Sequence, residues 1–169
     1  MTLFLDMDGV IADFFTLFAE ENKASHWKSI NCKESALQNI RRTDFFNRIK
    51  PFPISNDLVQ FAKNVGDWGI CSSPLKNDFG NSAYWKRVWL ERHDYMPSVE
   101  KCIFTRVKHK YAIHPITLQP NILVDDKPEN IEDWTNAGGI GVKFQANQDD
   151  FASLIKRLNS FLNVISLAS

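Results

Sequence analysis

The sequence predicts an α/β fold in which a mostly parallel sheet is covered by helices on both faces. Short apolar runs typical of buried strands alternate along the chain with stretches whose apolar residues recur at helical spacing. Acidic residues end the first and fourth of these runs, and a serine ends the second. Because open α/β sheets bind ligands outside the carboxyl ends of their strands, these polar residues also indicate where a functional site lies.

Five runs are predicted to be strands, and they cover residues 2–6, 68–72, 102–105, 122–125 and 140–144. Helical spacing predicts one helix from about residue 56 and another from near Ser82. Pro128 suits the first turn of a third helix, which Gly138-Gly139 can end. Residues 151–162 have the apolar spacing of a long amphipathic helix.

Residues 14–53 do not fit this alternation, because they contain helix-like pieces but no convincing strand. We therefore expect an insertion there, between two parts of one core, residues 1–13 and 54–169. The insertion is rich in aromatic and turn residues, namely Trp27, Phe45, Phe46, Pro51, Phe52 and Pro53. Most of these aromatic side chains are expected to form the insertion's own core.

Length and composition indicate one globular core domain. The chain has 169 residues, of which 44% are hydrophobic and 12% aromatic, and this supplies enough apolar surface for a packed interior. Lysine plus arginine and aspartate plus glutamate both number 20, so no global charge favours long nucleic acid or an anionic membrane as a partner.

The cysteines and the apolar runs indicate the compartment. Cys32, Cys71 and Cys102 lack C-x-x-C spacing, which argues against a disulfide framework or a zinc site. The sequence has neither a signal-peptide pattern nor an apolar run long enough to span a membrane. We therefore expect a cytoplasmic protein with reduced thiols, and a homodimer is compatible with the sequence.

The sequence Asp6-Met7-Asp8-Gly9-Val10 directly follows the apolar run of the first strand. Residues two apart in an extended chain share a face, so the carboxylates of Asp6 and Asp8 are expected to converge at the strand's carboxyl end. One carboxylate can then attack while the other transfers protons, which points to phosphoryl-transfer chemistry. The alternative is an Asp-Gly turn whose acids are solvated.

Groups that suit a phosphate follow the second strand. That strand ends in Ile70-Cys71-Ser72-Ser73-Pro74, where hydroxyls and backbone N–H groups can bind phosphate oxygens. A plain turn has the same composition. Lys86, in the next helix, can direct its ammonium group at the same phosphate, or it can be a solvated surface lysine.

Two adjacent acids, Asp125 and Asp126, close the fourth strand. Together with Asp6 and Asp8 they would collect four carboxylates at one edge of the sheet, and their mutual repulsion requires a cation. Oxygen ligands beside a phosphate favour Mg²⁺. The alternative role for one of the acids is to cap the helix that begins near Pro128.

In this order, Asp6-Met7-Asp8-Gly9-Val10, Ser72, Lys86 and Asp125-Asp126 resemble the four motifs of the haloacid dehalogenase (HAD) superfamily of aspartate-nucleophile phosphatases. Residues 6–14, 70–76, 104–106 and 123–128 resemble the 5′(3′)-deoxyribonucleotidase family more closely, and the likeness spans about residues 1–144. Ser72 stands where that family usually has Thr, a change that keeps the hydroxyl.

The resemblance implies a Rossmann-like core with strand order 5-4-1-2-3 and a small helical cap, residues 14–53, inserted after strand 1. It implies that Asp6 attacks phosphorus to form an aspartyl-phosphate, while Asp8 protonates the leaving oxygen and then activates water. Mg²⁺ is expected on Asp6, on the backbone carbonyl of Asp8, and on Asp125 or Asp126. The expected phosphate contacts are Ser72, Ser73, Lys86 and Arg106.

The predicted function is Mg²⁺-dependent hydrolysis of a (deoxy)nucleoside monophosphate to nucleoside and phosphate. A phosphatase for another small phosphomonoester and a non-catalytic nucleotide-binding module are the alternatives. Phe14 follows the catalytic loop and is expected to stack on the nucleobase, with Phe45 or Phe46 as partners from the insertion. The alternative for Phe14 is that it only packs the cap against the core.

Overall fold

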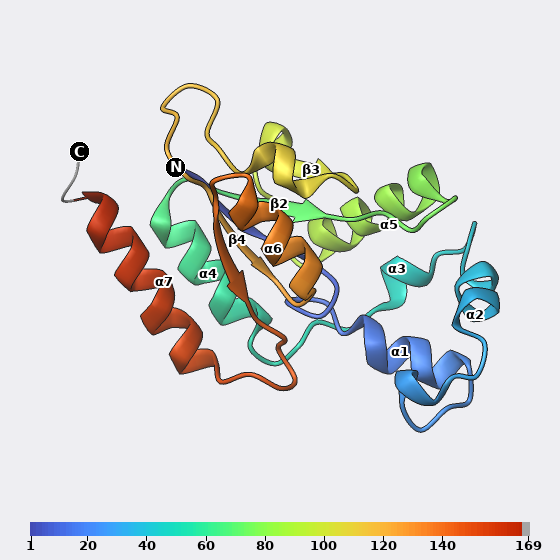
Figure 1. Ribbon diagram of the computed structural model, residues 1–169. Helices are drawn as coiled ribbons and strands as arrows, with labels where there is room; N and C mark the ends of the chain where they lie inside the picture. The colour runs from blue at the N-terminus through green and yellow to red at the C-terminus, as the bar shows by residue number, and fades with distance from the viewer. Residues whose placement is uncertain (167–169) are drawn as a thin grey trace.

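The computed structural model describes residues 1–166 and the side chains of residues 1–163 (Figure 1). Within this range, five parallel strands form a sheet of order β3-β2-β1-β4-β5. The strands are β1 (Leu3–Leu5), β2 (Trp68–Ser72), β3 (Cys102–Phe104), β4 (Ile122–Asp125) and β5 (Ile140–Lys143). The predicted strands are all present, within about one residue of their expected bounds, and the predicted order is confirmed when it is read from the opposite edge.

The helices that follow the strands of the core are α4 (Ser55–Val65), α5 (Phe79–Arg92), α6 (Pro128–Asn136) and α7 (Phe151–Ser166), with the 3₁₀ turns η2 (Val99–Lys101) and η3 (Lys108–Tyr111) on either side of β3. The starts of α4, α6 and α7 agree with the predictions. Helix α5 begins earlier than the expected start near Ser82, whose hydroxyl donates to the Asp78 carbonyl at 2.7 Å. The turn-prone residues before Ser82 fit the first helical turn, where N–H groups need no partner within the helix.

Alternating residues of β1 divide the core between the two faces of the sheet. Leu3 and Leu5 pack with buried residues of α4, α5 and α7, whereas Phe4 packs with Trp134 of α6 and with Ala112. Figure 1 shows α4 beside α7, with α6 across the sheet from them. A strand covered on both faces is apolar throughout, as Leu3-Phe4-Leu5 is.

The register of the sheet sets the functional strand ends side by side. Leu5 of β1 pairs with Ile70 of β2 and with Val124 of β4. The N–H of the next residue, Asp6, donates to the Val124 carbonyl at 2.9 Å. Asp6 therefore lies level with Asp125 at the carboxyl end of β4.

Residues 14–53, the inserted segment, contain α1 (Phe14–Glu21), η1 (Trp27–Ser29), α2 (Lys33–Asn39) and α3 (Phe45–Arg48). In Figure 1 these helices lie together, beyond the sheet and beside α5. Two buried hydrogen bonds hold the segment's return to the core. Trp89 Nε1 of α5 donates to the Ile49 carbonyl at 2.7 Å, and Ser55 Oγ donates to the Ile11 carbonyl at 2.6 Å.

The remaining features concern the thiols and the membrane. Cys32, Cys71 and Cys102 are free thiols, and only Cys32 of the three is exposed. Among residues 1–166, no helix combines the length and the apolar character that crossing a membrane requires.

Candidate active site

The loop after β1 presents two carboxylates at the centre of the sheet edge. The N–H of Met7 donates to Asp6 Oδ1 at 2.7 Å, and the Met7 carbonyl accepts from three N–H groups of the same loop. Gly9 makes this turn with a φ of +80°, in the region that favours glycine. A β-carbon on Gly9 would also lie 2.5 Å from Asp126 Oδ2. The glycine therefore lets the ends of β1 and β4 approach each other.

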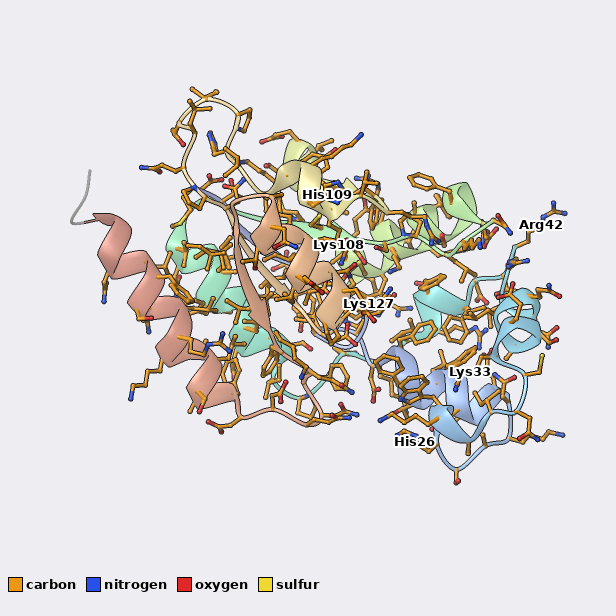
Figure 2. All side chains as sticks on the ribbon, viewed as in Figure 1. His26, Lys33, Arg42, Lys108, His109 and Lys127 are labelled. Carbon is orange, nitrogen blue, oxygen red and sulfur yellow. The ribbon has the colours of Figure 1, made fainter. Side chains whose placement is uncertain are left out.

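A buried lysine, Lys108 of η3, joins the ends of β1 and β4, and Figure 2 shows it at the sheet. Its Nζ lies 2.9 Å from Asp6 Oδ2 and 2.5 Å from Asp125 Oδ2. The sequence interpretation missed this residue. The available signal was its place just after the third strand, whose carboxyl end lies at the same edge of the sheet as Asp6.

The lysine that the sequence did indicate, Lys86 of α5, contacts the other acid. Its Nζ donates to Asp8 Oδ2 at 2.6 Å, to Ser72 Oγ at 2.9 Å and to the Ser73 carbonyl at 3.1 Å. It also lies 4.9 Å from the centre of the Phe46 ring. Lys86 is completely buried, so it is a member of the site rather than a solvated surface lysine.

The surroundings of Asp6 and Asp8 move their pKa values in opposite directions. Burial raises the pKa of Asp6. The charges of Lys108 and Lys86 and the hydrogen bonds to Asp6 lower this pKa by more than burial raises it, so the net pKa lies below its usual value. For Asp8, burial raises the pKa, the Asp6 charge adds to the rise, and the opposing charge of Lys86 does not cancel it. Such a separation is typical of a pair in which one carboxyl is the nucleophile and the other the acid.

Three carboxylates gather where β1 and β4 end. One oxygen from each of Asp6, Asp125 and Asp126 lies within 4.8 Å of the others. Burial and the neighbouring acids raise the pKa of Asp125 to about 6 and that of Asp126 to about 8. Asn130 Nδ2 orients Asp125 by donating to both of its oxygens, at 3.1 and 3.0 Å. Crowded acids that offer only oxygen ligands fit a hard divalent cation such as Mg²⁺.

The side chain of Asp8, expected as a fourth carboxylate, is not a member of this group, and Lys86 donates to one of its oxygens. The other oxygen, Oδ1, is buried without a hydrogen-bond partner among the described residues. An acid oxygen with no protein partner, beside a cavity, is placed to bond a ligand atom. The backbone carbonyl of Asp8 as a metal ligand stays a prediction.

A cavity of about 670 Å³ opens over these acids. One side of it consists of residues from the sheet edge, including Asp6, Asp8, Ser73, Arg106, Asp126 and Asn130. The other side consists of residues from the inserted segment, including Phe14, Phe15, Trp27, Glu34, Leu37, Arg41 and Phe46. Ser72, Lys86 and Asp125 are buried behind the first side and do not line the cavity.

Two of the three phenylalanines expected to contact substrate line the cavity, namely Phe14 and Phe46. Phe45 is completely buried and is not part of the lining. Its ring packs against those of Phe14 and Phe46, with ring centres 5.4 and 5.5 Å away. Phe45 was expected to contact the substrate, but in the structure it packs against other rings and does not reach the cavity.

The comparison with known sequences identifies a family. Residues 1–168 match the family described as 5′ nucleotidase, deoxy (pyrimidine), cytosolic type C protein. Similar proteins include the mitochondrial 5′(3′)-deoxyribonucleotidases of Mus musculus and Homo sapiens, which are 27% and 26% identical to the chain over 152 residues. Each alignment covers 76% of this chain, but 66% of the mouse protein and 63% of the human protein. The chain therefore spans less than two thirds of the length of these relatives.

The comparison with solved structures identifies the fold. A predicted phosphatase from Clostridium acetobutylicum is similar with a TM-score of 0.56 and 13% identity, over 94% of this chain and 98% of that one. A HAD family enzyme from Bacteroides thetaiotaomicron, solved as a magnesium complex, has a TM-score of 0.50 and 14% identity, over 91% and 97%. At these identities the likeness shows the shared α/β fold.

Proposed function

Because the chain belongs to the 5′ nucleotidase, deoxy (pyrimidine), cytosolic type C family, we propose that it hydrolyses (deoxy)nucleoside monophosphates to nucleoside and phosphate. The mouse and human relatives are named as deoxyribonucleotidases, which supports this choice among phosphomonoesters. The reaction also suits the site, because Asp6 and Asp8 line a cavity of about 670 Å³, a size within the ordinary range for small-molecule sites, and buried lysines lie behind them.

The observation that carries the proposal is the difference between Asp6 and Asp8. They are two residues apart, and each is held by its own lysine, Lys108 and Lys86 respectively. The pKa of Asp6 is lowered and that of Asp8 is raised. One strand end thus offers an ionised nucleophile beside a carboxyl that can hold a proton.

In the proposed reaction, a carboxylate oxygen of Asp6 attacks phosphorus and the bond from phosphorus to the ester oxygen breaks. Asp8 gives its proton to that departing oxygen, so the nucleoside leaves as an alcohol. Asp8 then takes a proton from a water molecule, whose oxygen attacks the phosphorus of the aspartyl-phosphate. Inorganic phosphate is released, and Asp6 returns to its carboxylate form.

The buried cations support these steps from below. Lys108 lies within 2.9 Å of the proposed nucleophile, so it fixes the orientation of Asp6 and offsets negative charge at the reacting centre. Lys86 holds Asp8 and Ser72 in place. Ser73 and Arg106 line the cavity, where they can bind the phosphate oxygens directly.

The proposed cofactor is Mg²⁺, held by the side chains of Asp6, Asp125 and Asp126. The convergence of their oxygens within 4.8 Å and the raised pKa values of Asp125 and Asp126 support this assignment. The magnesium complex of the Bacteroides thetaiotaomicron enzyme, which shares the fold, supports it as well. When bound, the ion supplies positive charge that lets an anionic substrate approach an anionic nucleophile.

Two further points belong to the proposal. Phe14 lines the cavity and offers an aromatic ring on which a nucleobase can stack. Phe46 also borders the cavity but is 3% exposed and packs against Phe14 and Lys86, so it supports Phe14. We also propose that residues 14–53 form a cap that encloses the substrate over the sheet edge. A cytoplasmic location and a homodimer stay predictions, and the two relatives reported above are named as mitochondrial proteins.

A substrate panel tests the proposed function. Phosphate release is measured with each common ribo- and deoxyribonucleoside monophosphate, with 2-deoxyribose 5-phosphate and with an aryl phosphate, first with Mg²⁺ and then with EDTA. The proposal expects nucleotides to give the highest kcat/KM and EDTA to abolish turnover until Mg²⁺ is restored. Equal kcat/KM for all phosphomonoesters would favour a general phosphatase, and no turnover at all would favour a binding module.

A further inference from the structure

The cavity carries an ion pair that the proposed reaction does not use. Glu34 in α2 and Arg41 just after it both line the cavity, together with Phe14. Arg41 Nη2 lies 3.2 Å from Glu34 Oε1. The side chain of Arg41 is 20% exposed, whereas that of Glu34 is 66% exposed. A carboxylate and a guanidinium group thus lie side by side in the cavity lining. Both come from the inserted segment and not from the loop that carries Asp6 and Asp8.

Surface packing alone does not explain this pair. An exposed ion pair contributes little to stability, so stability does not account for its position in the cavity wall. Moreover, Arg41 Nε is buried and has no hydrogen-bond partner among the described residues. A buried N–H without a partner is unfavourable, so an acceptor supplied by a ligand would remove a cost that the free protein bears.

The chemistry of the pair selects among ligands. A guanidinium group can only donate hydrogen bonds and an ionised carboxylate can only accept them. The Glu34 carboxylate would repel a second phosphate group of the ligand, so a site for such a group would be expected to contain positively charged side chains without a carboxylate. The Watson–Crick edge of a nucleobase, in contrast, presents a donor next to an acceptor, such as the N3–H and the carbonyl oxygen of thymine. That edge is complementary to a neighbouring carboxylate and guanidinium.

We infer that Glu34 and Arg41 hydrogen-bond the Watson–Crick edge of the nucleobase whose face stacks on Phe14. The inference rests on the proposed function and adds to it the residues that read the base. Aromatic stacking is tolerant of base identity, because every base has a flat face. The preference among bases therefore comes from the edge contacts of Glu34 and Arg41.

The test compares Glu34→Ala and Arg41→Met with wild type on thymidine 5′-monophosphate and on 2-deoxyribose 5-phosphate, which lacks a base. Gln38→Ala is the matched control, because Gln38 is exposed on the same helix and does not line the cavity. Each of the two test variants should raise KM for the nucleotide about 10-fold or more, as expected for the loss of a hydrogen bond to a charged group. Both test variants should hydrolyse the sugar phosphate as wild type does. The control Gln38→Ala should hydrolyse both substrates as wild type does.

A modified substrate sharpens the test. N3-methylthymidine 5′-monophosphate keeps the stacking face but lacks the N3–H, so wild type should lose about as much kcat/KM on it as Glu34→Ala loses on the normal nucleotide. Glu34→Ala should lose nothing further on the methylated substrate. A nucleotide preference that survives both variants would overturn the inference and leave the proposed function standing. A wild-type enzyme that does not prefer the nucleotide to the sugar phosphate would overturn both.

Discussion

The two sides of the cavity are built differently. The floor is formed by Asp6, Asp8 and Asp126, which line the cavity, together with Lys86, Lys108 and Asp125, which are buried beneath them, and the wall consists of Phe14, Glu34, Arg41 and Phe46. Within the floor, both lysines and Asp125 are almost completely buried. Ion pairs of 2.5 to 2.9 Å join Lys86 to Asp8 and Lys108 to both Asp6 and Asp125. The wall combines aromatic rings of α1 and α3 with a partly exposed ion pair between Glu34 of α2 and Arg41 just after that helix. In the proposed function, the floor carries out the reaction and the wall selects the substrate.

The largest effect is expected from Asp6→Asn. An amide is a poor nucleophile, so kcat should fall by about 10³-fold or more on every substrate while the protein still folds. Steady-state phosphate release and thermal unfolding measure the two consequences. Asp57→Asn, an exposed carboxyl in α4, is the control and should retain activity. Near wild-type turnover by Asp6→Asn would remove Asp6 from the reaction.

Asp8→Asn should be nearly as severe, but only where the leaving group needs a proton. We expect kcat on nucleotides to fall by about 10²- to 10⁴-fold, the usual contribution of acid–base catalysis. An aryl phosphate, whose leaving oxygen is less basic, should lose much less. The measurement is kcat for both substrates with wild type and variant, and equal losses would contradict the role of Asp8 as the acid.

Lys108→Met tests the floor as a structure. Removing Lys108 leaves Asp6 and Asp125 buried without their shared cation, which should lower the free energy of unfolding by about 3–5 kcal/mol. Lys63→Met breaks an exposed pair with Asp94, and that change should cost about 0–1 kcal/mol. Urea unfolding without added metal compares the two. Similar losses would mean that the floor is no more tightly coupled than the surface.

Phe14→Ala tests the wall and should have the smallest effect. Loss of base stacking should raise KM for nucleotides by an amount equivalent to about 1–3 kcal/mol, with little change in kcat. An aryl phosphate that does not reach the wall should keep its KM. If both substrates are affected alike and the melting temperature falls, Phe14 only packs the inserted segment against the core.

The sequence was sufficient for most of the floor, because the logic of a parallel sheet is simple. Apolar runs identify the strands, and the carboxyl ends of those strands meet at one edge. The sequence therefore predicts that Asp6, Asp8, Asp125 and Asp126 meet at this edge. The structure brings Asp6, Asp125 and Asp126 together, whereas the Asp8 side chain contacts Lys86. The sequence did not identify Lys108 as a site residue, because Lys108 begins a short 3₁₀ turn in which charged residues have no periodicity and resemble a solvated loop.

The wall could be predicted less well, since it depends on how short helices pack. Phe45 and Phe46 are neighbours in the chain, yet one is enclosed by other rings while the other lines the cavity. Consecutive helical residues point in directions about 100° apart, so the rotation of α3 decides which of the two rings borders the cavity. The pairing of Glu34 with Arg41 likewise depends on where the chain turns after α2, which no motif in the sequence specifies.

In the proposed mechanism, Asp6 forms a covalent bond to phosphorus. Brief turnover of a nucleotide, followed by borohydride reduction, converts an aspartyl-phosphate to homoserine, and peptide mass spectrometry then locates the changed residue. We expect homoserine at position 6 only when substrate and Mg²⁺ are present, and an unchanged Asp8. Modification at position 8, or no modification during active turnover, would contradict it.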